Sequence, residues 1–126
     1  MSRQRDWALR AHNCVLQRKE ANKSLSKYST SCKKGPALIQ RAGAAQALAF
    51  LRSRSEAEKN GEPKEMGRAY ADDLATVLGV RDGAKLLSKA QTDRFASYLE
   101  LSRNLLDASA WLQRFAQIEL ADVGEE

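Results

Sequence analysis

Apolar residues recur at steps of three and four along most of the chain, which is the period of an α-helix. No stretch alternates apolar and polar residues, with β-branched side chains, over the length of a strand. A chain of 126 residues suits one domain with one core. The pattern therefore predicts an all-α fold, a single-domain helical bundle of five to six helices over residues 1–126 with a long C-terminal helix.

The strongest predicted helix runs from Pro36 to Arg54. Proline is best tolerated in the first turn of a helix, so Pro36 favours a helix start and Gly35 the end of the preceding segment. Gly43 lies in the middle of this stretch, where glycine costs about 1 kcal/mol relative to alanine. We interpret Gly43 as a point of close helix approach within one continuous central helix.

The other predicted segments flank this central helix. They are a helix over 3–23, a short helix over 22–34, a loop at 55–65, a helix over 64–78 ended by Gly79, a short helix within 81–90, and a last helix that is capped by Thr92 or Asp93 and continues to about Ala121. The adjacent carboxylates Asp72 and Asp73 are expected on the outer side of the helix over 64–78.

The last predicted helix carries apolar residues on two sides. Its core face is predicted to comprise Phe95, Tyr98, Leu99, Ser102, Leu105, Leu106, Ser109, Leu112, Ala116 and Leu120. Trp111, Phe115 and Ile118 form a second stripe, because steps of four and three place them together on the opposite side. Either the N-terminal helix with Trp7 covers this stripe or a neighbouring subunit docks on it. We favour burial, because a soluble monomer rarely exposes such a pair of rings.

The charge is distributed unevenly along the chain. Residues 1–60 hold 13 Lys or Arg against 4 Asp or Glu, a net charge of +9, whereas residues 61–126 hold 8 against 12, a net charge of −4. A basic half of this size is typical of proteins that bind a phosphate backbone. A solvated surface explains the same charge more simply, and the opposite signs also allow head-to-tail self-association.

Candidate contacts to a nucleic-acid backbone lie on and around the central helix. Arg41 and Arg52 are eleven residues apart, which returns them to one side of a helix at a spacing of about 16 Å. Such a row suits phosphate contacts, and the few aromatic neighbours argue against base stacking. The full set of predicted contact residues is Arg18, Lys19, Lys33, Lys34, Arg41, Arg52 and Arg54.

The sequence contains no motif for catalysis or metal binding, neither a phosphate-binding Gly-rich loop nor a zinc pattern or catalytic dyad. His12 has no ligand or triad partner at suitable spacing. Cys14 and Cys32 lack the spacing of a redox or zinc motif and are expected to be reduced thiols. We therefore predict a protein that is not an enzyme and uses no metal, cofactor or small-molecule substrate.

A membrane location is also disfavoured. No apolar run approaches the length of about 20 residues that spans a bilayer, and no apolar signal region follows the first charges. The predicted helix over 3–23 is basic and amphipathic, and its apolar face comprises Trp7, Ala8, Ala11, Cys14 and Val15. This face is narrow and holds one aromatic residue, which does not favour binding to a membrane surface. We expect a soluble, cytoplasmic protein.

Two stretches resemble the signature of one family. The first reads P-A-L-I-Q-R over residues 36–41, followed by Gly43 and by Q-A-L-A-F-L over residues 46–51. The second is W-L-Q-R-F-A over residues 111–116. Both are similar to the small all-helical subunit of the type III-B CRISPR (Cmr) RNA-targeting effector complex, and the spacing between them fits.

The resemblance implies a non-catalytic subunit in antiviral defence. Such a subunit would contact the backbone of the guide and target RNA, the backbone and large subunits of the complex, and neighbouring copies of itself. The alternative is a stand-alone helical DNA-binding regulator. A recognition helix needs exposed base-reading side chains near its N-terminus, whereas the stretch 36–50 offers mainly Gln40, Arg41 and Gln46.

Overall fold

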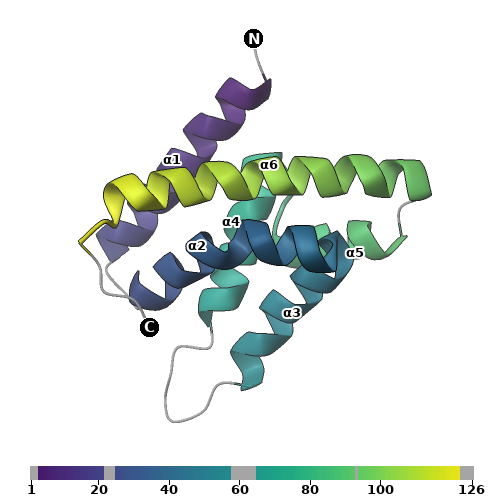
Figure 1. The fold of residues 1–126 in the computed structure, drawn as a ribbon, viewed down its shortest axis with the longest axis horizontal. Coiled ribbons are helices and arrows are strands. Elements are labelled where there is room, and N and C mark those ends of the chain that lie inside the picture. The colour runs from purple at the N-terminus through teal and green to yellow at the C-terminus, as the bar shows by residue number, and fades with distance from the viewer. Residues whose placement is uncertain (1–2, 22–24, 58–64, 93, 123–126) are drawn as a thin grey trace.

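The computed structural model describes residues 3–21, 25–57, 65–92 and 94–122. Within these ranges the chain forms six helices and no strand (Figure 1). They are α1 (Arg3–Ala21), α2 (Leu25–Ala42), α3 (Ala44–Ala57), α4 (Glu65–Leu78), α5 (Gly83–Thr92) and α6 (Phe95–Glu119). The predicted all-α bundle with a long C-terminal helix is confirmed, since α6 is the longest helix at 25 residues.

The predicted continuous central helix is wrong, because Gly43 divides it into α2 and α3. Gly43 has a φ of +85°, a left-handed conformation that glycine adopts without the steric cost of a side chain. Its amide still donates to the Ile39 carbonyl at 2.8 Å, and its carbonyl accepts from the Ala47 amide at 2.9 Å. Gly43 therefore ends one helix and begins the next without an intervening loop.

The predicted helix boundary at Gly35 and Pro36 is also wrong, because α2 runs through both residues. A Cβ atom at Gly35 would collide with the ring of Tyr70, so this glycine serves the close packing of α2 against α4. Pro36 lacks the amide that would bond to the Cys32 carbonyl. Burial of Cys32, Gly35 and Ile39 on the same face of α2 offsets this lost hydrogen bond.

Helices α2 and α6 lie side by side and run in opposite directions (Figure 1). The Gln113 side-chain amide of α6 donates to the Lys33 carbonyl of α2 at 2.8 Å. At the other end of α6, the Tyr98 hydroxyl accepts a hydrogen bond from the Ala45 amide in the first turn of α3, at 3.2 Å. These contacts hold α6 against α2 and the start of α3.

The core lies between α1, α2, α3, α4 and α6. The largest side chains that are fully buried include Tyr28, Leu48, Tyr70, Leu74, Leu105 and Leu112. Each buried side chain of this size contributes about 1.5–3 kcal/mol through the hydrophobic effect. The predicted inner face of α1 is confirmed for Trp7, Ala11, Cys14 and Val15, which are buried.

The core face of α6 differs from the prediction at its N-terminal end. Leu99 is 44% exposed, whereas Leu101, which was not predicted to be inside, is 8% exposed. The helix begins at Phe95 after Arg94, which makes no side-chain cap. The predicted cap at Thr92 is wrong, because Thr92 ends α5 and its hydroxyl donates to the Ser88 carbonyl. Asp93 lies outside the described residues.

The other boundaries are close to those predicted. Gly79 has a φ of +79° and follows the last residue of α4, as expected for a helix C-terminus. The predicted loop at 55–65 begins too early, since α3 continues to Ala57, and residues 58–64 lie outside the described residues. No helix in the described part of the chain is both long and apolar enough to cross a membrane.

Candidate nucleic-acid interface

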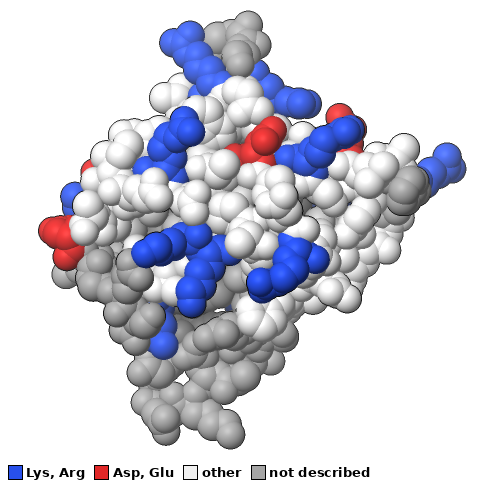
Figure 2. All heavy atoms as spheres, in the orientation of Figure 1, with Lys and Arg blue, Asp and Glu red and all other residues white. Residues whose placement is uncertain are grey.

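Helix α2 carries the clearest basic surface of the described structure. Its 18 residues include Lys27, Lys33, Lys34 and Arg41 and no Asp or Glu. Lys33, Lys34 and Arg41 are exposed. Lys34 and Arg41 are seven residues apart, nearly two helical turns, so they point in similar directions about 10 Å apart. Figure 2 shows Lys and Arg side chains gathered over α2, below α6, on the face in view.

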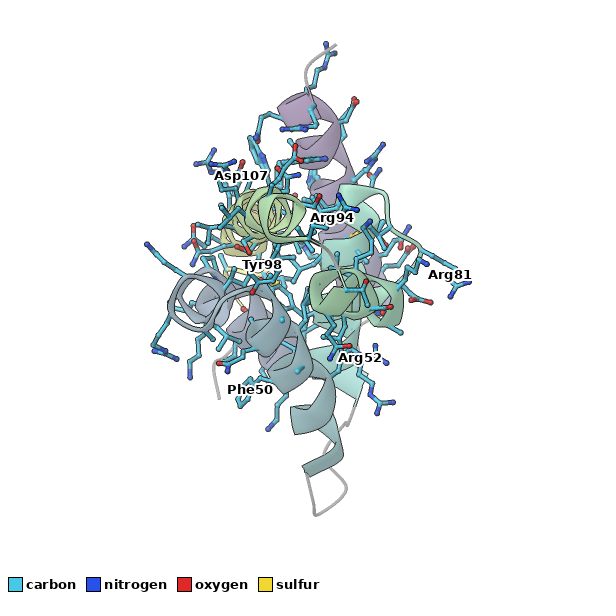
Figure 3. The ribbon with its side chains drawn as sticks, turned by 90° about the vertical axis from the view of Figure 1, so that its right-hand side faces the viewer. Phe50, Arg52, Arg81, Arg94, Tyr98 and Asp107 are labelled. Atoms are coloured by element: carbon cyan, nitrogen blue, oxygen red, sulfur yellow. The ribbon has the colours of Figure 1, made fainter. Side chains whose placement is uncertain are left out.

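The predicted ridge of Arg41 and Arg52 on one helix is wrong. Arg41 belongs to α2 and Arg52 to α3, and the break at Gly43 lies between them. Arg52 is half-buried, and its carbonyl accepts a hydrogen bond from Arg68 of α4 at 3.3 Å. Figure 3 shows Arg52 and Phe50 on different sides of α3. The side chain of Arg54 lies outside the described residues.

The surroundings of Arg52 also include the turn between α4 and α5. The pKa of Asp82 in this turn is lowered, first by the hydrogen bond from the Lys85 amide and then by nearby positive charges, Arg52 among them. Arg52 therefore lies near a carboxylate of the α4–α5 turn.

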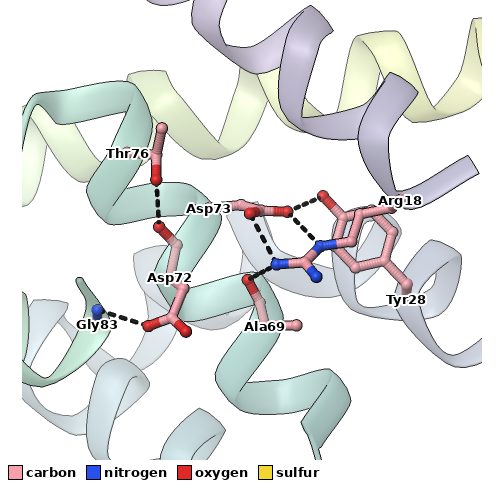
Figure 4. Close-up of polar contacts among 7 residues, drawn as sticks. All are labelled: Arg18, Tyr28, Ala69, Asp72, Asp73, Thr76 and Gly83. Atoms are coloured by element: carbon pink, nitrogen blue, oxygen red, sulfur yellow. Dashed lines mark hydrogen bonds and ion pairs between the residues drawn. The ribbon is translucent and has the colours of Figure 1, made fainter. Parts of the chain in front are cut away.

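Arg18, another predicted contact residue, is half-buried and binds a carboxylate of α4 (Figure 4). Its Nε donates to Asp73 Oδ2 at 3.1 Å, and its Nη2 donates to Asp73 Oδ1 at 3.0 Å and to the Ala69 carbonyl at 3.3 Å. The Tyr28 hydroxyl donates to the same carboxylate. Asp73 thus joins α1, α2 and α4 at one point.

The predicted outer position of the two adjacent carboxylates is wrong for Asp73, which is only 6% exposed. Burial raises the pKa of Asp73, and the hydrogen bonds from Arg18 and Tyr28 oppose that rise. Asp72 is half-buried, and its Oδ1 accepts a hydrogen bond from the Gly83 amide at 2.7 Å. The pair therefore stabilises helix packing and the start of α5.

The two cysteines are free and buried. Burial is the main cause that raises the pKa of Cys14 to about 12, and burial likewise raises the pKa of Cys32. Both side chains are therefore neutral thiols at physiological pH, and a thiol is a much weaker nucleophile than a thiolate. Among the described residues, no three His, Cys, Asp or Glu side chains gather to hold a metal ion.

Lys19 and His12 both contact Glu119 where α1 crosses the end of α6. His12 Nε2 lies 2.9 Å from Glu119 Oε2, and Lys19 Nζ lies 3.7 Å from Oε1. The His12 ring stacks on Phe115 with 4.4 Å between ring centroids. The hydrogen bond with His12 is the main cause that lowers the pKa of Glu119. Both residues thus contribute to the contact between the two helices.

The second apolar stripe of α6 is covered in part. Trp111 and Phe115 are half-buried and stack with 6.1 Å between centroids. The Trp111 Nε1 donates to Gln4 of α1 at 2.7 Å. Ile118, in contrast, is 62% exposed. Helix α1 therefore covers the two rings through Gln4 and His12 and leaves Ile118 in solvent.

Two exposed arginines on α6, Arg103 and Arg114, were not among the predicted contact residues. They are eleven residues apart, the same spacing that drew attention to Arg41 and Arg52. They belong to the acidic half of the chain, which is why the net charge of that half concealed them. Unlike Arg41 and Arg52, these two arginines belong to one uninterrupted helix.

The chain is similar along nearly its whole length to proteins of one family. The family described as CRISPR-associated protein (Cas_Cmr5) matches residues 3–119. The CRISPR system Cmr subunit Cmr5 of Thermus thermophilus is 36% identical over 116 residues, which are 92% of this chain and 94% of that protein. A crystal structure of a CRISPR-associated Cmr5 family protein from Thermus thermophilus has a TM-score of 0.80 at 36% identity, covering 94% of this chain and 97% of that chain.

The alternative of a stand-alone DNA-binding regulator finds no support in these similarities. The helical fold, the two short signature stretches and the whole-length similarity all indicate one family instead. The chain belongs to the Cmr5 family of CRISPR-associated proteins.

Proposed function

We propose that this chain is the small, non-catalytic subunit of a type III-B CRISPR (Cmr) effector complex. In this role it contacts the backbone of the guide and target RNA, neighbouring copies of itself, and the backbone and large subunits. The guide RNA supplies sequence specificity, and other subunits supply enzymatic activity. The relative named as a Cmr subunit, which aligns over 92% of this chain, supports membership of such a complex.

The observation that supports RNA contact is the composition of α2. The helix holds four cations and no carboxylate, and Lys33, Lys34 and Arg41 are exposed on it. Each phosphate that a cation neutralises releases condensed counterions, so exposed cations on a helix that has no carboxylate of its own favour binding to a phosphate backbone. Such contacts position RNA without reading its bases, which suits a subunit of a complex whose specificity comes from the guide.

The non-catalytic role is supported by what the reactive side chains do. Cys14 and Cys32 are buried thiols, and Asp73 is bound by Arg18 and Tyr28. His12, the only histidine of the chain, contacts Glu119 and Phe115. Each of these groups has a packing role that accounts for its position.

The membership is tested by capturing a tagged chain from cells that produce the Cmr subunits and a guide RNA. We expect the other subunits and the guide to be recovered with it. The variant K33E/K34E/R41E is then compared with R81E/K85E, whose two cations are exposed at the α4–α5 turn and on α5.

We expect K33E/K34E/R41E to weaken binding of target RNA by the assembled complex about tenfold, with a smaller loss at high salt. The R81E/K85E complex should bind as the unaltered one does. Recovery of the chain without the subunits would contradict membership, and unchanged target binding by K33E/K34E/R41E would contradict RNA contact by α2.

A further inference from the structure

The chain turns from α2 into α3 at one residue, Gly43, whose φ is +85° (Figure 1). The Gly43 amide donates to the last turn of α2, and its carbonyl accepts from the first turn of α3. Helical bonding therefore stops and restarts at the same residue. The amides of residues 44–46 consequently do not donate to the carbonyls four residues earlier, as they would in one continuous helix.

The Ala45 amide, which the bend removes from helical bonding, has a partner on α6. It donates to the Tyr98 hydroxyl at 3.2 Å. A Cβ atom at position 43 would lie 3.1 Å from the same hydroxyl, and it would add the steric cost of a left-handed conformation. The bend is thus stabilised by the missing side chain of Gly43 and by the Tyr98 hydroxyl.

The sequence around the bend favours a straight helix. Residues 42–49 read A-G-A-A-Q-A-L-A, and apart from the glycine these residues have high helix propensity. Straightening would return the amides of residues 44–46 to helical hydrogen bonds. The bend is opposed by these local preferences and held by packing, since Ala44, Ala47 and Leu48 are fully buried.

The helices before the bend pack mainly on the helices after it. Helix α1 contacts α4 and α6, and α2 contacts α3, α4 and α6. Arg18 of α1 and Tyr28 of α2 both donate to the Asp73 carboxylate of α4. Because these contacts join one unit, α1–α2, to another, α3–α6, they would form equally well if the two units came from different copies of the chain.

We infer that Gly43 is the hinge of a domain exchange, in which α2 and α3 straighten into one helix and the α1–α2 unit of each copy packs on the α3–α6 unit of a second copy. Such a dimer keeps the contacts between the units and restores the helical bonds of residues 44–46. Exchange of identical elements is a low-cost route to dimers, and short hinges under strain favour it. The inference does not depend on the proposed function. It gives the chain a second form that returns to the monomer slowly, because the two units must first separate.

The hinge is tested by unfolding the purified full chain in urea, refolding it over a range of protein concentrations, and measuring the dimer by size-exclusion chromatography with light scattering. G43A should favour the dimer, because a helix interior prefers alanine to glycine by a factor of about five. With a hinge in each chain of the dimer, the association constant should rise about 25-fold. Y98F removes an acceptor that only the bent form uses, and it should give a smaller rise.

Two further variants serve as controls, and circular dichroism checks that every variant folds. G79A places the same methyl group at a second glycine with a positive φ, +79°. Residues 79–82 separate α4 from α5 there, so G79A lacks a one-residue hinge and should not raise the dimer fraction. Q46P should suppress the dimer, because the first turn of α3 tolerates proline whereas the interior of a continuous helix does not.

The contact of Lys19 on α1 with Glu119 on α6 distinguishes exchange from association of intact monomers. Lys19 Nζ lies 3.7 Å from Glu119 Oε1, so a carbodiimide should couple the two side chains as an amide. Isotope-labelled and unlabelled chains are refolded together, and the coupled peptides of the dimer are identified by mass spectrometry. The exchanged dimer should yield links between a labelled and an unlabelled peptide, and E119Q should yield no link at this position.

Each contrary outcome overturns the inference. If G43A and Y98F both fold and refold only to monomers at the highest concentration, Gly43 is not a hinge. If the dimer yields links within one label alone, intact monomers associate and no unit is exchanged. If G79A dimerises as strongly as G43A, the dimer follows from lost stability and not from the hinge. Should G43A fail to fold, equal dimer fractions for Y98F and Q46P would contradict the exchange.

Discussion

Two sets of cations from the basic half of the chain have opposite surroundings. On α1, Arg18 donates two hydrogen bonds to the buried carboxylate of Asp73. On α2, Lys33, Lys34 and Arg41 are exposed on a helix without any carboxylate. The same residue types therefore hold helices together in one region and form a basic surface in the other.

The difference shows why net charge alone is a poor guide to a binding surface. A cation that is paired with a carboxylate adds little to the field outside the protein, because the two charges cancel at a distance. Arg18 and Lys19 both have such partners, Asp73 and Glu119. The local absence of carboxylates along α2 is a better signal, and it can be read from the sequence.

The largest effect on stability is expected when Arg18 of α1 loses its carboxylate partner, Asp73. Asp73→Ala leaves the half-buried Arg18 guanidinium with only the Ala69 carbonyl as an acceptor, and it leaves the buried Tyr28 hydroxyl without its acceptor. Removing one partner of a buried ion pair costs about 3–5 kcal/mol, so we expect a loss of this size in the free energy of unfolding. Urea denaturation followed by circular dichroism measures it.

Asp72→Ala is the matched control, because it removes the same side chain one position earlier. The Asp72 side chain accepts a hydrogen bond from the Gly83 amide at the start of α5, and the loss of such a helix cap costs about 1 kcal/mol. Equal losses for the two variants would contradict the view that Asp73 joins three helices. The double variant R18M/D73L should lose less than Asp73→Ala, because no charge is left buried without a partner.

The sequence could predict those features of the fold that depend on neighbours along the chain. The helical period identified the buried face of α1 with Trp7 and Val15, since one face of a single helix determines it. Gly79 was recognised as a helix end because the left-handed conformation at that position favours glycine. The two signature stretches identified the family, and the whole-length comparisons confirmed it.

The features that the sequence could not predict depend on distant residues. Gly35 lies within α2 because Tyr70 packs against it, and the local sequence favours a helix end there. Asp73 is buried because Arg18, which is 55 residues earlier, meets it. Gly43 was assigned correctly as a special position but given the wrong conformation, since close approach and a positive φ both explain a glycine in such a stretch.

A smaller effect on stability is expected from replacing Trp111, whose side chain is neither fully buried nor fully exposed. Its ring is half-buried and donates to Gln4 of α1. A fully buried tryptophan costs about 3–5 kcal/mol when replaced by alanine, so Trp111→Ala should cost less, about 2 kcal/mol, in urea denaturation. Ile118→Ala is the control, with an expected change of at most about 0.5 kcal/mol because Ile118 is 62% exposed.

The result for Trp111 also separates packing from docking. If Trp111→Ala unfolds as the unaltered chain does and yet fails to enter the complex, the rings serve a neighbouring subunit and not the contact with α1. If Ile118→Ala alone prevents incorporation, the exposed end of the stripe is the docking surface. A loss of stability confined to Trp111 supports burial by α1.

The smallest effect is expected at the contact of Glu119 with His12 and Lys19, which are exposed enough for solvent to weaken it. The pKa of Glu119 is lowered from 4.5, so the carboxylate stabilises the folded state at pH values above about 4.5. That contribution is lost as the pH falls through the lowered pKa and the carboxylate becomes protonated. The difference in unfolding free energy between the unaltered chain and Glu119→Gln should therefore shrink as the pH falls below about 4.5. A difference that stays the same from about pH 6 down to about pH 3 would show that the charge of Glu119 contributes nothing and that the stack of His12 on Phe115 alone holds α1 at this end of α6.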